Sequence, residues 1–250
     1  MKRLLWVLLA VVVIVVVVVV VLLQGRGGET GKIRVATDAT WAPFEYVNTT
    51  TREIVGFDID LFDAIAERAN LDVEYVNVAW DPLLAGMAQG TYDAAISSIT
   101  IKPERLAEMD FSHPYYVAGQ IIVTLNSSTN ITGPETLSGK SVGVQTGTTG
   151  DDEAQSINGT NVVGYDEIGM AFVALMANQI DAVICDTPVA SGYVDKYDIL
   201  KTVGEVLTTE QYGIAVPKGS EELLDKINTA LDALLAEGII DQLTAKWLVA

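Results

Sequence analysis

The alternation of strand-length and helix-length segments constrains the fold of this chain more than any other feature. In the first part of the chain, short apolar runs alternate with longer amphipathic runs. In order, these are a strand at 33–38, a helix at 58–70, a strand at 73–78, a second helix and the strand YDAAIS at 92–97. The second helix is expected to open with Asp81 as N-cap and Pro82 at its first position, and to end near Gly90. The order strand, helix, strand, helix, strand predicts a parallel sheet covered by helices.

The same order returns later in the chain and predicts a second unit of similar build. Its segments are a strand at 141–146, a helix starting in GTTGDDEAQ at 147–155, a short strand at 162–165, a helix at 166–179 and a strand at 181–186. Asp93-Ala94 and Asp181-Ala182 introduce similar apolar runs in the two units. We interpret the two units as two α/β lobes.

Two extended segments, 115–125 and 201–216, are expected to cross between these lobes. If the chain crosses at both, the last predicted helix, 220–238, returns to the first lobe. The predicted lobes are lobe 1, at 32–117 and 209–250, and lobe 2, at 118–208. The predicted fold class is therefore α/β, with two lobes on a two-stranded hinge that lets them close on a ligand.

The N-terminus predicts a membrane anchor. Residues 4–23 are an unbroken apolar run, and about 20 such residues span a bilayer as a helix. Residues 1–3 carry Lys2 and Arg3, which place this end in the cytoplasm and the rest outside. A cleaved signal peptide has a shorter apolar core, of about 7–15 residues, and stays open as the alternative. We expect an uncleaved anchor, a Gly-rich linker at 24–31, and a location on the extracellular face of the membrane.

Charge and composition exclude several functions. The formal net charge is −18, whereas a nucleic-acid-binding domain needs a basic face. His113 and Cys185 are the sole histidine and cysteine, too few for a usual zinc site, so no metal or cofactor is expected.

Four Asn-X-Ser/Thr motifs in polar, turn-rich stretches predict possible N-glycosylation. Their asparagines are Asn48, Asn126, Asn130 and Asn158.

Candidate site residues follow the strands. In open α/β sheets a ligand lies beyond the carboxyl ends of the strands. Acidic, hydroxyl, amide and aromatic residues and one arginine fall there: Asp38, Trp41, Phe44, Glu45, Trp80, Ser97, Ser98, Thr100, Arg105, Gln145, Gly147, Thr146, Thr148, Thr149 and Asp186. This combination matches an α-amino acid, because a guanidinium grips a carboxylate and an acidic side chain pairs with an ammonium.

Each group has a role in that hypothesis. Arg105 would hold the carboxylate, with added donors from Ser98 and Thr100 and from the backbone N–H groups of GTTG at a helix start. Asp186 would bind the ammonium. The rings of Trp41 and Trp80 would enclose an apolar or cationic side chain.

Each group also has a purely structural alternative. Arg105 could pair with Glu108 on a solvated helix, and Asp186 could cap a helix. The two tryptophans could belong to the core, and Ser97 and Ser98 could be strand-end hydroxyls without a ligand. His113, next to a proline, is interpreted as a turn residue.

Long stretches of the chain resemble the family 3 extracellular solute-binding proteins, the amino-acid receptors of ABC importers. The resemblance covers about residues 32–247 and is carried by IRVATDATWAPFEYVN, by the run from GFDIDL through WDPLLAGMAQGTYDAAISSITIKPER to SHPYY, by LSGKSVGVQTGTTG, by QIDAVICDTPVA and by YGIAVPKG. It implies a periplasmic-binding-protein fold of the Venus-flytrap type. This sequence differs at its N-terminus, since bacterial relatives carry a cleaved signal or a lipidated cysteine.

The resemblance also implies roles for individual residues. It implies that Arg105, Thr100 and the amide of Thr149 bind the ligand carboxylate, and that Asp186 with Ser98 binds the α-ammonium. The residues it places around the ligand side chain are Asp38, Trp41, Trp80, Ser97 and Gln145.

We therefore expect a monomeric, non-enzymatic receptor that delivers a polar or basic L-amino acid to an ABC transporter permease. Asp38 beside two tryptophans favours arginine or lysine, with glutamine open. The alternatives are a ligand-binding sensor module and a cyclohexadienyl dehydratase-like enzyme on the same fold. The enzyme would need a general acid, for which Glu45 or Asp38 could be proposed, although neither has an evident partner to tune it.

Overall fold

The computed structural model describes residues 31–248. The chain divides into two compact units, residues 1–32 and 33–250, and all elements named below belong to the second. The predicted cytoplasmic N-terminus at 1–3, the predicted anchor at 4–23 and all but the last residue of the predicted linker lie outside the described residues. Among residues 31–248, no helix combines the length and the apolar character needed to cross a membrane.

The first sheet contains strands from both ends of the second unit. Its order is β5-β1-β6-β15-β7, with β1 parallel to β5 and β6, and β15 antiparallel to β6 and β7. The strands are β1 (Ile33–Thr37), β5 (Val73–Asn77), β6 (Ala94–Ala95), β7 (Met109–Phe111) and β15 (Ala215–Pro217). The associated helices are α2 (Phe57–Ala69), α3 (Trp80–Ala88), α4 (Pro103–Glu108), α8 (Glu221–Ala236) and α9 (Ile239–Trp247). The C-terminal part of the chain therefore does return to this sheet.

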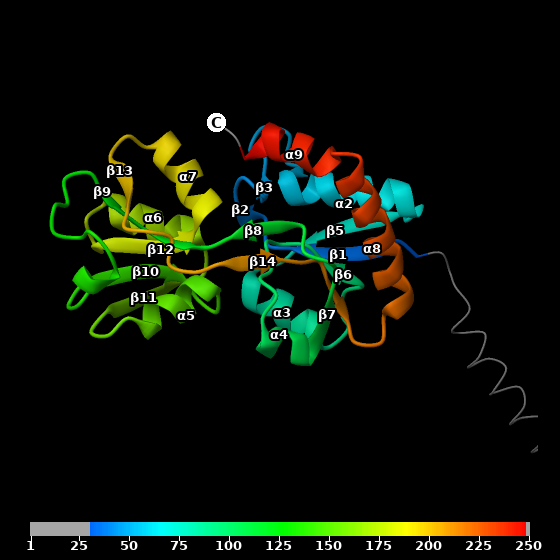
Figure 1. The fold of residues 1–250 in the computed structure, drawn as a ribbon, viewed down its shortest axis with the longest axis horizontal. Helices are drawn as coiled ribbons and strands as arrows, with labels where there is room; N and C mark the ends of the chain where they lie inside the picture. The colour runs from blue at the N-terminus through cyan, green and yellow to red at the C-terminus, as the bar shows by residue number, and fades with distance from the viewer. Residues whose placement is uncertain (1–30, 249–250) are drawn as a thin grey trace, which may run out of the picture. The chain divides into compact units, whose positions relative to one another are not determined.

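The second sheet is built from the middle of the sequence. Its order is β11-β10-β12-β9-β13, with parallel β10, β11 and β12 and antiparallel β9. The strands are β9 (Gln120–Leu125), β10 (Ser141–Gln145), β11 (Asn161–Tyr165), β12 (Ala182–Asp186) and β13 (Leu200–Val203). Its helices are η1 (Pro134–Thr136), α5 (Thr149–Ser156), α6 (Ile168–Met176) and α7 (Thr187–Lys196). Figure 1 shows each sheet with helices on its faces.

Two strands link the sheets. β8 (Tyr116–Ala118) and β14 (Glu210–Tyr212) pair antiparallel, and Figure 1 shows them running between the lobes. This confirms the predicted α/β class with two lobes and a two-stranded hinge. The division at 117/118 and 208/209 remains our proposal.

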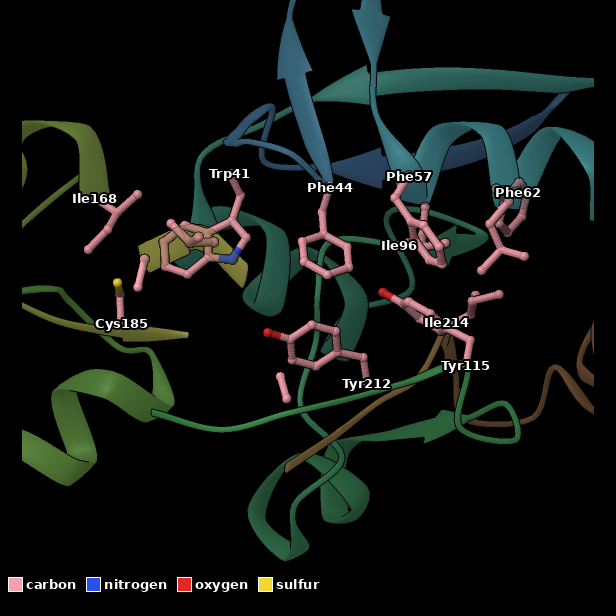
Figure 2. Packing of buried hydrophobic residues seen from close by; sticks show 14 of the residues in the cluster. Trp41, Phe44, Phe57, Phe62, Ile96, Tyr115, Ile168, Cys185, Tyr212 and Ile214 are labelled. Atoms are coloured by element: carbon pink, nitrogen blue, oxygen red, sulfur yellow. The ribbon is translucent and has the colours of Figure 1, made fainter. Parts of the chain in front are cut away.

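Aromatic packing holds the hinge against the first lobe. Phe44 is fully buried, and its ring centroid lies 5.2 Å from that of Tyr116 and 5.5 Å from that of Tyr212. Figure 2 shows Phe44 and Tyr212 facing each other in this cluster. Phe44 lies in the turn between β2 (Thr40–Trp41) and β3 (Glu45–Val47), which form a small sheet with β4 (Ile54–Val55). This turn therefore reaches the base of the hinge.

Three local expectations were wrong. Helix α3 begins at Trp80 with Ala79 as its N-cap, so Asp81 lies inside the first turn. The strand predicted at 92–97 is reduced to Ala94–Ala95, because the chain bends at Ser98, whose φ is +49°. A further helix, α9, follows α8 after Gly238, whose positive φ of 71° turns the chain between them.

Candidate ligand-binding site

A cavity lies between the two lobes, and the space within it and at its mouth amounts to about 320 Å³. The structure places all ten predicted ligand-binding residues on its wall, together with Glu45 and Thr148: Asp38, Trp41, Trp80, Ser97, Ser98, Thr100, Arg105, Gln145, Thr149 and Asp186.

Strand ends explain why residues distant in sequence meet here. Asp38 directly follows β1, whose neighbour β6 leads into Ser97. In the second lobe, Gln145 and Asp186 are the last residues of the neighbouring parallel strands β10 and β12. Because parallel strands share one carboxyl edge, each lobe presents its polar residues along that edge.

Arg105 forms one pole of the cavity. Its side chain is buried, its Nη1 donates to the backbone oxygen of Thr100 at 3.0 Å, and its Cζ lies 5.0 Å from the ring centroid of Trp80. Its Nη2 has no hydrogen-bond partner within residues 31–248. Burial lowers the pKa of Arg105, yet a guanidinium stays charged in proteins. A buried cation with a free donor is therefore available to an anion, and the solvated pairing with Glu108 was wrong.

The hydroxyls beside Arg105 point elsewhere. Thr100 Oγ1 and Thr149 Oγ1 each donate to Glu210 Oε2 at 2.7 Å. These protons are therefore committed to Glu210, and the expected ligand donor from the Thr100 hydroxyl is not free. Thr149 is the first residue of α5, and the first N–H groups of a helix have no acceptor within it. They are suited to an anion.

Asp186 is the acidic residue that the second lobe contributes to the cavity wall. It occupies the N-cap position of α7, but its side chain makes no capping hydrogen bond. The alternative that the Asp186 side chain serves only to cap this helix is therefore wrong. Gln120 Nε2 donates to Asp186 Oδ1 at 2.9 Å. Burial, and next the charge of Glu210, raise the pKa of Asp186 to about 7. A cation bound here would favour the ionised form.

A second group of residues on the cavity wall consists of acceptors. Asp38 accepts from Thr40 Oγ1 at 3.0 Å and from Gln145 Nε2 at 2.9 Å, and burial raises its pKa. Gln145 then presents Oε1, which has no partner within the described range. A ligand group at this end must therefore donate hydrogen bonds.

Glu45 adds a fully buried carboxyl group to the same wall. It accepts from Ser97 Oγ at 2.8 Å, while its Oε2 is unpartnered within residues 31–248. Burial, followed by the charge of Asp58, raises the pKa of Glu45 well above its ordinary value. Asp58, also buried, accepts from the Ser98 N–H at 2.8 Å and from Tyr115 Oη at 2.9 Å. These bonds fix the bend at Ser97 and Ser98.

The two tryptophans differ in their surroundings. Both are more than nine-tenths buried on the cavity wall, at 7% exposure for Trp41 and 8% for Trp80. One face of Trp80 carries Arg105, so this ring can offer a ligand only its other face. Its Nε1 donates to the Gly147 backbone oxygen of the second lobe at 3.0 Å.

Contacts across the cavity show that the lobes are closed. Besides the Trp80–Gly147 bond, Gln145 reaches Asp38, and Lys102 Nζ lies 2.5 Å from Asp152 Oδ2. Each contact joins the first lobe to the second. The cavity is therefore enclosed by both lobes and held by direct bonds between them.

Some residues of the site were not predicted as ligand-binding. Glu45 was noted at a strand end, whereas Gln120, Thr208 and Glu210 lie in extended segments that carry no ligand motif.

His113 lies outside the cavity, with Nδ1 2.9 Å from Asp232 Oδ1. Among residues 31–248, no group of three or more His, Cys, Asp or Glu side chains could hold a metal ion.

Comparison with known proteins identifies the family that this chain matches. The sequence profile of the bacterial extracellular solute-binding proteins, family 3, matches residues 33–250. The chain is 33% identical over 222 residues to ABC transporter arginine-binding protein 1 of Escherichia coli strain K12, covering 86% of this chain and 90% of that protein.

Solved structures agree with the fold. The P235GK mutant of ArgBP from T. maritima is 39% identical, with a TM-score of 0.84 over 88% of this chain and 96% of that one. The ancestral amino acid-binding protein AncCDT-1, described as a precursor of cyclohexadienyl dehydratase, is 33% identical with a TM-score of 0.82, over 87% of this chain and 96% of that one.

Proposed function

The chain belongs to the bacterial extracellular solute-binding proteins of family 3, and we propose that it captures a basic L-amino acid, arginine first, for delivery to the permease of an ABC transporter. The arginine-binding relative of E. coli and ArgBP of T. maritima support this ligand class. The ligand would be held between the two lobes by a monomer.

One observation carries the proposal: the wall of the cavity matches a molecule with one anionic and two cationic groups. Arg105 offers an unpartnered donor to the α-carboxylate, and Asp186 faces the same pole for the α-ammonium. Elsewhere on the wall, Asp38 and Gln145 Oε1 are acceptors, which suits a guanidinium or a second ammonium. An acidic side chain there would meet a carboxylate, and that contact is repulsive.

A thermal-shift screen of the purified full-length chain against the standard amino acids, each at about 1 mM, tests this. A ligand with micromolar Kd would be at about 1,000 times its Kd and would add about 4 kcal/mol of stability. Strong shifts with arginine or lysine support the proposal. Shifts with glutamine or other neutral amino acids alone would contradict a basic ligand, and no shift with any would contradict an amino-acid ligand.

We infer that the chain is a binding protein rather than an enzyme, in line with the named functions of its relatives. One feature favours the enzyme alternative: Glu45 is a buried carboxyl on the cavity wall beside Asp58, and burial raises its pKa well above the ordinary value. That is the property of a general acid. Incubation with prephenate, followed by product analysis, tests this alternative. Turnover that is lost in Glu45→Gln would overturn the binding-only role.

We also propose that residues 4–23 anchor the chain on the outer face of the membrane, which their apolar length and the preceding Lys2 and Arg3 support. Three of the glycosylation candidates, Asn126, Asn130 and Asn158, are exposed and Asn48 is half-buried. Asn126 Nδ2 donates to the Asp198 backbone oxygen, so a glycan there would replace that bond. Membrane fractionation and mass spectrometry of the native protein, respectively, would test the anchor and the glycans.

A further inference from the structure

A buried carboxylate on the hinge joins both lobes at the ligand's proposed carboxylate pole. Glu210 is the first residue of β14 and is 7% exposed. Its Oε2 accepts from Thr100 Oγ1 of the first lobe and from Thr149 Oγ1 of the second, both at 2.7 Å. One oxygen atom therefore holds a side chain of each lobe.

The other oxygen of Glu210 is equally engaged. Its Oε1 accepts from Thr208 Oγ1 at 2.8 Å and from Gln120 Nε2 at 3.1 Å. Since all four partners donate, the carboxyl group acts only as an acceptor, which is the behaviour of the ionised form. Glu210 is thus a buried anion satisfied by four donors, the condition that makes such burial tolerable.

Gln120 extends this network to the ammonium pole. It is the cross-strand neighbour of Asp186 on β9 and β12, and the same Nε2 donates to Asp186 Oδ1 at 2.9 Å. Its amide nitrogen faces the two carboxylates, as their acceptor character requires. Glu210 is therefore connected through one side chain to the residue that would bind the α-ammonium.

The position of Glu210 makes the network sensitive to closure. β14 pairs with β8 in the hinge, and Thr100 is bridged to Tyr212 of the same strand. Thr149 instead begins α5 in the second lobe. A rotation of the lobes about the hinge would carry Thr149 away from Thr100, so a single oxygen can accept from both only in the closed arrangement.

We propose that Glu210 is a positioning residue that couples lobe closure to capture of the ligand's α-carboxylate, by locking Thr100 and Thr149 together. In the closed form it orients the backbone of both threonines toward the cavity and accepts a hydrogen bond from each hydroxyl. This proposal rests on the proposed function, because it assumes an amino-acid ligand. Its charge also lies close enough to Arg105 and Asp186 to affect the ionisation of both.

The test compares Glu210→Gln with the matched control Glu205→Gln, an exposed carboxylate in the segment that precedes β14. Affinity for L-arginine is measured by calorimetry from pH 5 to pH 8. Closure is measured separately, without ligand, by the distance between spin labels at Asp225→Cys and Ala177→Cys. The native Cys185 is buried, so the labels react at the introduced sites.

We expect Glu210→Gln to bind arginine at least about tenfold more weakly and to show longer label distances, with Glu205→Gln unchanged in both. Removing the Glu210 charge lowers the pKa of Asp186, so the fall of affinity in acid should move to lower pH. Affinity within twofold of the native protein, with unchanged distances, would overturn the proposal. If the native protein binds no arginine, the proposed function fails, while the label distances still test the link between Glu210 and closure.

A second pair of variants decides the matter if Glu210→Gln does not fold. Thr149→Ser keeps the hydroxyl and Thr149→Val removes it, and both keep the backbone N–H. We expect the valine variant to favour the open form and the serine variant to behave as the native protein. Equal behaviour of the two would overturn the proposal. Where Glu210→Gln does fold, its combination with Thr149→Val should be non-additive, as for contacting residues.

Discussion

Arg105 lies over the ring of Trp80, with its Cζ 5.0 Å from the ring centroid, while Trp80 Nε1 donates to Gly147 in the other lobe. The Trp80 indole therefore contacts the guanidinium of Arg105 and also makes a hydrogen bond between the two lobes. Under the proposed function, ligand binding and lobe closure would share side chains at this point and at Glu210.

Replacing Arg105 should remove the guanidinium that is proposed to bind the ligand's carboxylate. For Arg105→Ala we expect a loss of at least about 2 kcal/mol in the free energy of binding, because the ligand carboxylate would remain desolvated without its partner. Calorimetry with L-arginine measures this. The control is Arg68→Ala, which removes an exposed ion pair with Glu237 and should leave Kd unchanged. An unaltered Kd in Arg105→Ala would show that this residue does not contact the ligand.

Replacing Asp38 tests the identity of the ligand. Asp38→Ala should reduce affinity for arginine far more than affinity for glutamine, since only the former places a positive charge at this pole. Asp38→Asn, which keeps the acceptor to Thr40, separates the charge from the hydrogen bond. Competition binding with both amino acids is the measurement, and equal losses for the two would defeat the cationic-ligand idea.

The ionisation of Asp186 predicts how affinity depends on pH. Its pKa of about 7 in the closed arrangement means that the carboxyl must lose a proton to bind an ammonium. Affinity should therefore rise from pH 5 toward pH 8, by up to about tenfold per pH unit below the pKa. Titrations across this range check the slope. A flat profile would show that Asp186 does not hold the ammonium.

The same group predicts the opposite trend for the stability of the ligand-free protein. Because its pKa is raised from 3.8 to about 7 on folding, the native state binds more protons than the unfolded state between these values. The free energy of unfolding should then fall as pH rises through this window, and Asp58, with a pKa also of about 7, acts in the same direction. Chemical denaturation at pH 5 and pH 8 measures this. Asp186→Asn should flatten the trend, and an unaltered trend would assign it to other groups.

The burial of Phe44 predicts how much the aromatic packing at the hinge contributes to the free energy of unfolding. It is fully buried between Tyr116 and Tyr212, so Phe44→Ala should lower the free energy of unfolding by about 3–5 kcal/mol. Denaturant unfolding measures the loss. Phe44→Leu, which keeps most of the volume, should cost clearly less, and equal costs for the two would show that packing is not what this ring supplies.

The sequence predicted that these residues would meet at one cavity because several of them follow strands of the two sheets. Asp38, Gln145 and Asp186 sit at the ends of strands whose patterns are clear, so their convergence could be inferred from a parallel sheet. Which contacts each side chain makes could not be inferred in this way. The Thr100 hydroxyl donates to Glu210, which lies 110 residues away on a strand with no motif of its own.

Local chain direction was predicted less well than topology. The bend at Ser98 depends on Asp58, a buried carboxylate 40 residues earlier that accepts the Ser98 N–H. No pattern near Ser98 indicates this partner. Similarly, α9 follows α8 directly because Gly238 adopts a positive φ, and glycine there reads equally well as the end of a final helix.

The place of β15 in the first sheet has a consequence for how the chain folds as it is synthesised. β15 lies between β6 and β7, yet it follows the whole second lobe in sequence. The second sheet has all its strands once residue 203 has emerged, whereas the first sheet lacks its inner strand until residue 217. The lobe that begins first must therefore finish last, and until then β6 and β7 present unpaired edges to any chaperone or neighbouring chain.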